Sequence, residues 1–266
     1  MDRFSMQIGN LALGNYGLAP ALEIIAVGSI EFQQDCLFTL TGAKRQEARL
    51  LEHRSSGQTV VDLAHGSIAL ARKGDCLTLG PPEYGFRTYL CHSRCDAENL
   101  TDRHRSLLGR TAPRYSEICS VEDPDNRVRV LRGPEWGFLE DPSRFLEQPW
   151  VTTRDMSDMG VRLRSFSGGF LAAKRREIIS APVNDGTIQL TAKGPIVLLR
   201  SRQTLGGYPR IFNVIGPDID LLGQFAPDQT MRFTEVSLDE ALDIACRKKR
   251  DIESFQQRWG LGVLAS

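Results

Sequence analysis

Short apolar runs, each ended within a few residues by glycine, proline, aspartate or asparagine, dominate this sequence of 266 residues. The runs are strand-sized and rich in β-branched residues, and turn-forming residues bound most of them. Thr187–Leu190 alternates polar and apolar residues, which predicts a strand with one face in water. A chain of many short strands and few helices is expected to fold as a mainly β protein, built here from two barrel or sandwich units. The predicted strands are Ala21–Val27, Cys36–Leu40, Thr59–Leu63, Ser67–Ala71, Cys76–Leu79, Arg127–Leu131, Ile178–Ile179, Thr187–Leu190, Ile196–Leu199 and Ile211–Ile215.

Three segments carry helical signals. The clearest is near the C-terminus, where Ser237 and Glu240 form a capping-box pattern ahead of apolar residues at helical spacing. Gly260 is expected to end this helix. Residues 4–13 and residues 219–225 are the other two candidates.

A polar segment at residues 122–126 interrupts the strand pattern and contains a proline, as linkers between domains do. We therefore expect an N-terminal β domain at residues 1–121, a second β domain at residues 127–236, and a C-terminal helix and tail at residues 237–266. Residues 91–114 are polar and poor in strand signals, which predicts a long loop or a short irregular helix.

The charge balance excludes several classes of partner. Lys plus Arg number 33 and Asp plus Glu number 33, so the formal net charge is zero. Binding to nucleic acid or to a membrane surface needs a one-sided basic excess. The basic run at residues 247–250 is followed by Asp251 and Glu253, as on a solvated helix face. Without a membrane-length apolar stretch or a signal-peptide core at the start, the chain is expected to be cytoplasmic and to bind neither membrane nor nucleic acid.

The six cysteines are expected to be reduced thiols in that compartment. Cys91 and Cys95, with His104 and Cys119 downstream, have the chemistry of zinc ligands. Structural zinc sites usually carry two tight ligand pairs, whereas this sequence offers one loose pair. We therefore expect no metal site and interpret most of the cysteines as small buried hydrophobes.

The segment Gln203-Thr204-Leu205-Gly206-Gly207-Tyr208-Pro209 is the most informative motif. Gly206 and Gly207 allow backbone conformations and close approaches that other residues do not. Gln203 and Thr204 are neutral donors and acceptors, and Tyr208 adds a ring and a hydroxyl. These residue types favour a binding segment for a neutral polar ligand. The alternative is a tight turn between two strands.

The order of motifs around this segment carries a resemblance to a known family. The series, in chain order, is Arg129-Val130-Leu131-Arg132-Gly133-Pro134, Met159-Gly160-Val161-Arg162-Leu163, Ser180-Ala181-Pro182-Val183, Gly186-Thr187-Ile188-Gln189, Gly194-Pro195-Ile196-Val197, Gln203 to Pro209, and Asp220-Leu221-Leu222-Gly223-Gln224. Asp2-Arg3-Phe4-Ser5, Gly14-Asn15, Leu22-Glu23 and Leu40-Thr41-Gly42-Ala43 add to it nearer the start. The series resembles the biotin-dependent carboxyltransferase family, which includes the C subunit of 5-oxoprolinase, also called allophanate hydrolase subunit 2, and a region of urea carboxylase.

That resemblance implies cyclophilin-like β units and a protein that works beside partner chains. A 5-oxoprolinase C subunit would join the A and B subunits of that enzyme, the B subunit resembling a kinase inhibitor, to open 5-oxoproline at the expense of ATP. In urea carboxylase the matching region passes a carboxyl group from carboxybiotin to urea. This sequence has neither a Met-Lys-Met biotin attachment motif nor a glycine-rich ATP loop, so ATP or carboxybiotin would reach the reaction through partner subunits.

A small amide or lactam substrate suits the polar residues of these motifs, because paired neutral donors and acceptors discriminate such groups strongly. The candidate substrate-binding residues are Gln189, Gln203, Thr204, Gly206, Gly207, Tyr208 and Arg162, and the catalytic residues are left open. Arg162 either holds a carboxylate by a bidentate contact or forms a structural ion pair. Gln189 is either a ligand contact or an exposed strand residue.

The sequence also departs from the family pattern. Residues that usually precede the Met-Asp pair, including Gln-Asp-x-Gly-Arg, are missing, so either the start lies late or a first strand is absent. Cys91-His92-Ser93-Arg94-Cys95 stands where glycine-rich motifs are usual, and we expect a polar, cationic loop there. Asp158 replaces an arginine, and Ser201 replaces an aspartate. These changes favour, as an alternative function, a catalytically drifted protein that binds or regulates a partner subunit.

Overall fold

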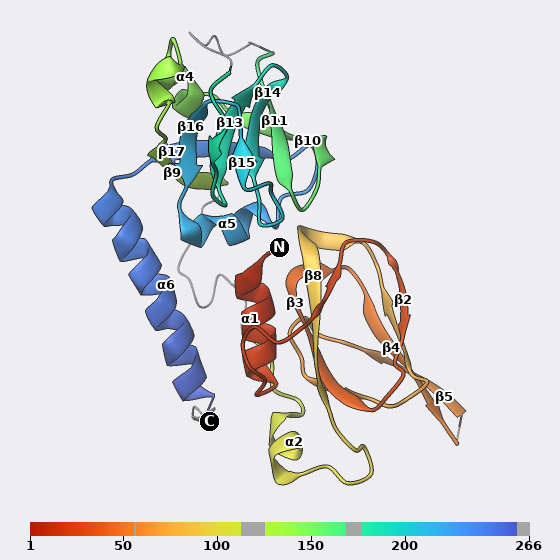
Figure 1. The fold of residues 1–266 in the computed structure, drawn as a ribbon. Coiled ribbons are helices and arrows are strands. Elements are labelled where there is room, and N and C mark those ends of the chain that lie inside the picture. The colour runs from red at the N-terminus through yellow and green to blue at the C-terminus, as the bar shows by residue number, and fades with distance from the viewer. Residues whose placement is uncertain (56, 113–125, 169–176, 260–266) are drawn as a thin grey trace. The chain divides into compact units, whose positions relative to one another are not determined.

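The computed structural model describes residues 1–55, 57–112, 126–168 and 177–259 (Figure 1). This part of the chain divides into two compact units. The first, the barrel unit, contains Met1 and the described part of Val121–Lys249; the second, the sandwich unit, contains the described parts of Asp2–Ser120 and Arg250–Ser266. The expected mainly β fold with a few helices and a C-terminal helix is confirmed.

Seven strands of the barrel unit close into a barrel. In their order around the barrel they are β10 (Trp150–Met156), β11 (Gly160–Ser165), β14 (Gly194–Leu198), β13 (Thr187–Thr191), β16 (Arg210–Val214), β9 (Arg127–Arg132) and β17 (Thr230–Glu235). Neighbouring strands run antiparallel, except that β17 and β9 are parallel. Because side chains alternate along a strand, every second residue points into the barrel. The inward positions are fully buried, as Val161, Ile188 and Val197 show.

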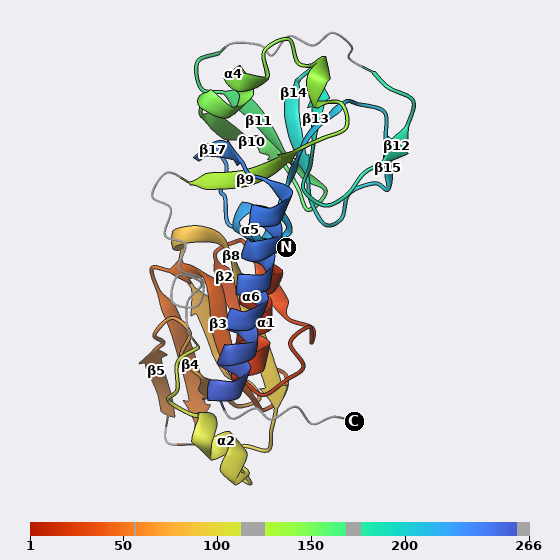
Figure 2. The same ribbon diagram turned by 90° about the vertical axis from the view of Figure 1, so that its left-hand side faces the viewer.

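Shorter elements complete the barrel unit: η1 (Trp136–Phe138), α4 (Pro142–Glu147), β12 (Ala181–Pro182), β15 (Leu205–Gly206) and α5 (Gly216–Leu222). The side chain of Asp141 caps the N-terminus of α4 by accepting a hydrogen bond from the amide of Arg144. Its Phe145 is buried in the core and stacks on Phe212, with ring centroids 4.9 Å apart. Among the described residues, strands β12 and β15 form a separate two-stranded ribbon beside the barrel (Figure 2).

The sandwich unit contains two four-stranded sheets. The first has the order β1 (Leu22–Ile24), β8 (Pro82–Arg94), β3 (Cys36–Arg45), β6 (Ala69–Ala71), and the second β2 (Gly28–Glu31), β7 (Cys76–Leu79), β4 (Ala48–Arg54), β5 (Gly57–Asp62). Phe38, Leu50, Leu77 and Leu90 come from both sheets and share one core cluster. Burial of this shared face holds the two sheets together.

Strand β3 is buried on both faces, since alternate side chains belong to different cores. Phe38 points into the core between the sheets, whereas Leu37 joins the core formed with α1 (Arg3–Ala12). The α1 helix packs its apolar residues, including Phe4 and Ile8, onto β3 and β8. Its predicted extent, residues 4–13, is therefore confirmed to within a residue.

The remaining helices are α2 (Asp102–Leu107) and α6 (Leu238–Arg258). The capping box of α6 forms as expected: the amide of Ser237 donates to Glu240, and the amide of Glu240 donates to the Ser237 hydroxyl. Residues of α6 up to Lys249 belong to the barrel unit, and Phe255 packs in the sandwich unit against the core that contains Phe4. No helix in the described ranges combines the length and the apolar character that crossing a bilayer requires.

Several expectations were wrong in detail. Cys91–Arg94 is the end of β8, not a loop, because these residues pair with β3 at Cys36–Thr39. Ile178–Ile179 lies outside any strand, and α5 begins three residues before the predicted Ile219. Gly260, residue 56 and residues 113–125 lie outside the described residues, so the expected helix stop at Gly260 and the predicted polar linker at 122–126 stay predictions.

Candidate functional site

The motif Gln203–Pro209 connects barrel strand β14 to barrel strand β16 and contains β15 (Figure 2). Its backbone is held at three points along its length. The carbonyl of Thr204 accepts from the amide of Val183 at 3.1 Å, and that of Gly207 accepts from Ile178 at 2.9 Å. The carbonyl of Pro209 accepts from Leu190 at 3.0 Å. The motif is therefore an extended segment paired with residues 178–183, not a tight turn.

Gln189 on β13 lies beneath this segment and is 1% exposed. Its neighbours Ile188 and Leu190 point into the barrel, so Gln189 points outward. Its amide Nε2 donates to the carbonyl of Tyr208 at 3.3 Å. The expectation of a water-facing side chain at Gln189 was wrong, because the motif covers that face of the strand.

The two glycines of the motif have different surroundings. A Cβ built on Gly206 would overlap the Nε2 atom of Gln189, so a glycine is required there for the close approach of the two segments. A Cβ on Gly207 would meet only ordinary contacts, at 3.6 Å from the carbonyl oxygen of Ile178 and from the hydroxyl of Ser180. Gly206 thus makes room for the Gln189 side chain, whereas a Cβ at Gly207 would fit with ordinary contacts.

The polar side chains of Gln203, Thr204 and Tyr208 are exposed, with Tyr208 at 42%. The structure therefore brings together Gln189, Gly206 and the backbone of Tyr208, but leaves the three other polar groups on the surface of the segment. These three side chains are neutral hydrogen-bond donors and acceptors that a ligand could contact. They stand on a backbone that Gln189 holds by its bond to the carbonyl of Tyr208.

Arg162 on β11 forms an ion pair with Asp155, with Nε 2.7 Å from Oδ2. Its Nη1 also donates to the hydroxyl of Thr191 at 3.0 Å. The side chain points to the same outer face of the barrel as Gln189, since both residues stand opposite Ile196. Because Asp155 pairs with its charge, Arg162 forms a structural ion pair in this arrangement.

Glu135 and Arg210 anchor the end of the motif and were missed by the sequence reasoning. Arg210, which follows Pro209, donates to Glu135 from its backbone amide, Nε and Nη2, at 3.0, 2.9 and 2.7 Å. These side-chain bonds hold the pKa of Glu135 below its ordinary value, against a smaller opposing effect of burial. The Nη1 atom of Arg210 also donates to the carbonyl of Pro182 in β12, so the Arg210 guanidinium connects the ribbon to the barrel.

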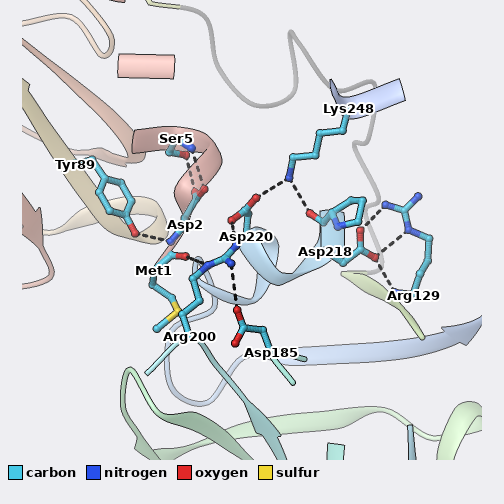
Figure 3. Close-up of polar contacts among 11 residues, drawn as sticks. Met1, Asp2, Ser5, Tyr89, Arg129, Asp185, Arg200, Asp218, Asp220 and Lys248 are labelled. Carbon is cyan, nitrogen blue, oxygen red and sulfur yellow. Dashed lines mark hydrogen bonds and ion pairs between the residues drawn. The ribbon is translucent and has the colours of Figure 1, made fainter. Parts of the chain in front are cut away.

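A second ionic cluster lies on α5 in the barrel unit (Figure 3). Asp220 accepts from Arg200 Nη2 at 2.7 Å and from Lys248 Nζ at 2.7 Å. Burial acts to raise the pKa of Asp220, but Lys248 and Arg200 outweigh it, so the pKa lies below its ordinary value. Nearby, Asp218 accepts from both the backbone and the guanidinium of Arg129. The basic run at residues 247–250 thus includes a buried structural contact and not only a solvated face.

In the sandwich unit, residues from three of the family-like segments meet in one polar cluster, and Figure 3 shows its members Asp2, Ser5 and Tyr89. Asp2 begins α1 by accepting from the amide of Ser5 at 2.9 Å, and its own amide donates to the Tyr89 hydroxyl at 2.6 Å. That hydroxyl donates to Glu23 at 2.6 Å, and Thr41 donates to the carbonyl of Ser5 at 2.7 Å. Burial, with the nearby carboxylates of Asp2 and Glu23, raises the pKa of Tyr89. Because these groups satisfy one another, the cluster anchors α1 to β1, β3 and β8.

The cysteines in the described ranges are free thiols. Burial raises the pKa of Cys91 to about 12, and that of Cys36 to about 12 with help from nearby Cys95 and Asp35. No group of three or more His, Cys, Asp or Glu suited to a metal ion occurs among the residues whose placement is described. Cys119 lies outside them.

Comparison with known proteins assigns the family. The family described as carboxyltransferase domain, subdomain A and B, matches residues 1–95 and 96–235. The chain belongs to this carboxyltransferase-domain family. Over 286 aligned residues it is 32% identical to the 5-oxoprolinase C subunit of Escherichia coli (strain K12), covering 97% of this chain and 88% of that protein. It is 28% identical to the 5-oxoprolinase C subunit of Haemophilus influenzae, with the same two coverages.

The family fold is also seen in a much larger protein. The crystal structure of the urea amidolyase from K. lactis superposes with a TM-score of 0.76 at 17% identity, over 96% of this chain. This chain corresponds to only 18% of that protein, so the likeness concerns the fold alone.

Two departures from the carboxyltransferase pattern lie side by side in the structure. The backbone amide of Ser201 donates to the carbonyl of Asp158 at 3.1 Å, and the amide of Leu199 donates to that of Met159 at 2.9 Å. Asp158 and Ser201 stand where the pattern has an arginine and an aspartate.

Proposed function

We propose that this chain is the C-type subunit of a multi-chain enzyme of the 5-oxoprolinase type, which opens 5-oxoproline to glutamate at the expense of ATP. The observation that carries the proposal is the 32% identity to the Escherichia coli protein over 97% of this chain and 88% of that protein. A match of that extent includes both units, so the whole chain corresponds to one such protein and not to a shared module.

The geometry of the motif supports a small amide or lactam as the substrate. Gln203, Thr204 and Tyr208 present neutral polar groups from a segment that is fixed by Gln189 and by the Arg210–Glu135 pair. Fixed donors and acceptors favour a ligand that satisfies them over one that leaves them unpaired, which is how a neutral amide is discriminated. In this proposal these residues bind substrate, and the catalytic groups are supplied in part by other chains.

The proposed partners are the A-type and B-type subunits of such an enzyme, the B type being kinase-inhibitor-like, and ATP enters through them. The printed sequence supports this division of labour, since it contains no Gly-x-x-x-x-Gly-Lys loop for ATP phosphates and no Met-Lys-Met motif for biotin. A carboxyl transfer of the urea carboxylase type, with carboxybiotin delivered by a partner, is the second candidate. The match to the family described as carboxyltransferase domain, subdomain A and B, favours it.

The non-catalytic alternative is a protein that binds and regulates a partner subunit without turnover. Asp158 and Ser201 are the features that favour it, because they stand where the family pattern is expected to have an arginine and an aspartate, and their backbones are hydrogen-bonded next to the motif. Its distinguishing prediction is a stable complex in which neither 5-oxoproline nor urea is consumed.

The test is to reconstitute the chain with A-type and B-type subunits from the same source and to follow glutamate and ADP formation from 5-oxoproline and ATP. Parallel arms contain urea, bicarbonate and ATP, together with a biotin carboxylase. Glutamate formation that falls when Tyr208 is replaced by Ala supports the proposal. The matched control is Tyr16→Ala, a tyrosine of the sandwich unit that is 76% exposed. A stable complex without turnover in either arm supports the regulatory alternative, and turnover only in the urea arm supports carboxyl transfer.

A further inference from the structure

Arg202, immediately before the motif, has a hydrogen-bond donor that the described protein does not satisfy. Its Nε atom is buried and has no hydrogen-bond partner among the described residues. Its Nη1 lies 2.9 Å from Oδ1 of Asp185, and 20% of the side chain reaches solvent. A buried donor without an acceptor costs free energy, and more so when it belongs to a charged group.

The carboxylate that Arg202 contacts is also shared. Arg200 lies 3.5 Å from the other oxygen of Asp185, while its closer contact is Asp220 at 2.7 Å. A guanidinium has five N–H donors along two edges that match a carboxylate. Asp185 approaches Arg202 at Nη1, so Nε is the donor that still lacks an acceptor. Because Nε is buried while 20% of the side chain is exposed, an acceptor supplied by a ligand would reach Nε only if the side chain shifted.

The other arginines around the barrel that could take this role are already matched. Arg129 is paired with Asp218 through two guanidinium nitrogens, and Arg210 with Glu135 in the same way. Arg162, which the sequence offered either as a carboxylate ligand or as a structural ion pair, is paired with Asp155. In the described part of the barrel unit, Arg202 is thus the arginine whose Nε is both buried and unsatisfied.

Arg202 is also next to the exposed polar groups of the motif. Consecutive Cα atoms are about 3.8 Å apart, so the Cα atoms of Gln203 and Thr204 lie within about 4 and about 7 Å of that of Arg202. A guanidinium beside the neutral side chains of Gln203 and Thr204 is suited to a small molecule that has a carboxylate next to an amide. We propose that the Nε edge of Arg202 binds the carboxylate of such a ligand, a carboxylated lactam, while Gln203 and Thr204 contact its amide. This inference rests on the proposed function and names 5-oxoproline, not urea, as the substrate class.

Binding of two probes to the full-length chain tests the assignment. Isothermal titration with 5-oxoproline and with 2-pyrrolidinone, the same lactam without the carboxylate, isolates the contribution of the carboxylate. We expect 5-oxoproline to bind at least about tenfold more tightly, since a hydrogen bond to a charged group is worth about one to two powers of ten in affinity. Equal affinity for the two probes would overturn the assignment, as would the absence of saturable 5-oxoproline binding both to the chain alone and to the reconstituted complex.

Variants locate the effect at Arg202. Arg202→Lys keeps the charge and a contact with Asp185 but lacks the planar fork, and Arg202→Gln removes the charge. Both should weaken 5-oxoproline binding by about 10- to 100-fold and leave 2-pyrrolidinone unchanged. The control Arg154→Gln alters an arginine whose side chain is 87% exposed and should have no effect. Unchanged 5-oxoproline affinity in Arg202→Lys, with a melting temperature equal to the wild type, would refute a bidentate contact.

Turnover separates failure of this inference from failure of the proposed function. If the complex opens 5-oxoproline and Arg202→Gln has an unchanged KM, the function stands and the Arg202 assignment is wrong. If the complex does not open 5-oxoproline but the chain binds it through Arg202, the binding site stands and the proposed enzyme function fails.

Discussion

Replacing Gly206 by alanine should destabilise the barrel unit through a single contact, the one with Gln189. The added Cβ would overlap Nε2 of Gln189 and lie 3.2 and 3.3 Å from its Cδ and Oε1 atoms. Because Gln189 is only 1% exposed, its amide has no free path to solvent and must give up its bond to Tyr208. Overpacking of this kind costs about 1–3 kcal/mol, and the lost hydrogen bond contributes about 0.5–1.5 kcal/mol. We expect a loss of about 2 kcal/mol in the free energy of unfolding.

The adjacent glycine is the matched control. Gly207→Ala makes the same chemical change, but its Cβ would have ordinary contacts at 3.6 Å. Both substitutions stiffen the unfolded chain alike, by about 0.4–1 kcal/mol, so this effect cancels in the comparison. A second control places Gly206→Ala in a Gln189→Ala background, where the obstructing amide is gone and most of the cost should disappear.

The assay is urea unfolding followed by tryptophan fluorescence. The chain has three tryptophans, and in a Trp259→Phe background the two that remain, Trp136 and Trp150, both belong to the barrel unit. Equal costs for Gly206→Ala and Gly207→Ala would refute the reasoning. So would a cost of Gly206→Ala that is the same with and without the Gln189 side chain.

Three further predictions concern the charged and sulfur groups. Because the pKa of Asp220 is lowered, its contribution to stability is present above about pH 4, its unfolded value, and is lost as the pH falls through the folded value; urea unfolding from pH 2 to 6 should therefore show a flatter acid slope for Asp220→Asn than for the wild type. Native alkylation with iodoacetamide at pH 8, read by mass spectrometry, should modify exposed Cys246 and spare Cys91, whose pKa is raised to about 12; rapid modification of Cys91 would contradict its burial. Glu135→Gln should cost about 1–3 kcal/mol in thermal unfolding, since it weakens the charged hydrogen bonds that hold the end of the motif, and an unchanged melting temperature would show that this anchor is dispensable.

Much of the fold could be read from local patterns because the relevant signals are local. Strand β7 at Cys76–Leu79 has the predicted bounds. Strand β9 ends one residue later than predicted, and β16 begins and ends one residue earlier. The capping box at Ser237 formed as expected, since all its atoms lie within one helical turn. Runs of β-branched residues and caps depend on near neighbours, and near neighbours are what a sequence displays.

Several of the strands that were missed share a different property. Strands β10 and β11 contain charged residues such as Arg154, Asp155 and Arg162, and β8 ends with the polar run Cys91–Arg94. Their extended conformation is fixed by pairing with other strands, as Cys91 of β8 is by Thr39 of β3. Strand preference depends on such cross-strand neighbours more than on the residue itself, so no local pattern marked them.

For the candidate site, the sequence located the motif but not the surroundings of its residues. Alternation at Thr187–Leu190 showed that Gln189 points away from the core residues beside it, and this was correct. It could not show that residues 203–209 return to cover that face and bury Gln189. The sequence left Arg162 open as a carboxylate ligand or a structural ion pair, and its partner Asp155 became evident only when β10 and β11 were paired.

By itself, the sequence determined that the chain is mainly β, that it ends in a capped helix, and that Gln203–Pro209 is the segment to examine. These conclusions depend on residue type and spacing along the chain. Tertiary structure alone decided which polar side chains have hydrogen-bond or ion-pair partners. Gln189 is buried, Arg162 and Arg210 are paired, and Arg202 keeps a buried Nε without a partner among the described residues. The physical reason is that hydrogen bonds and ion pairs are made between groups brought close in space, and barrel closure, not sequence order, sets those distances.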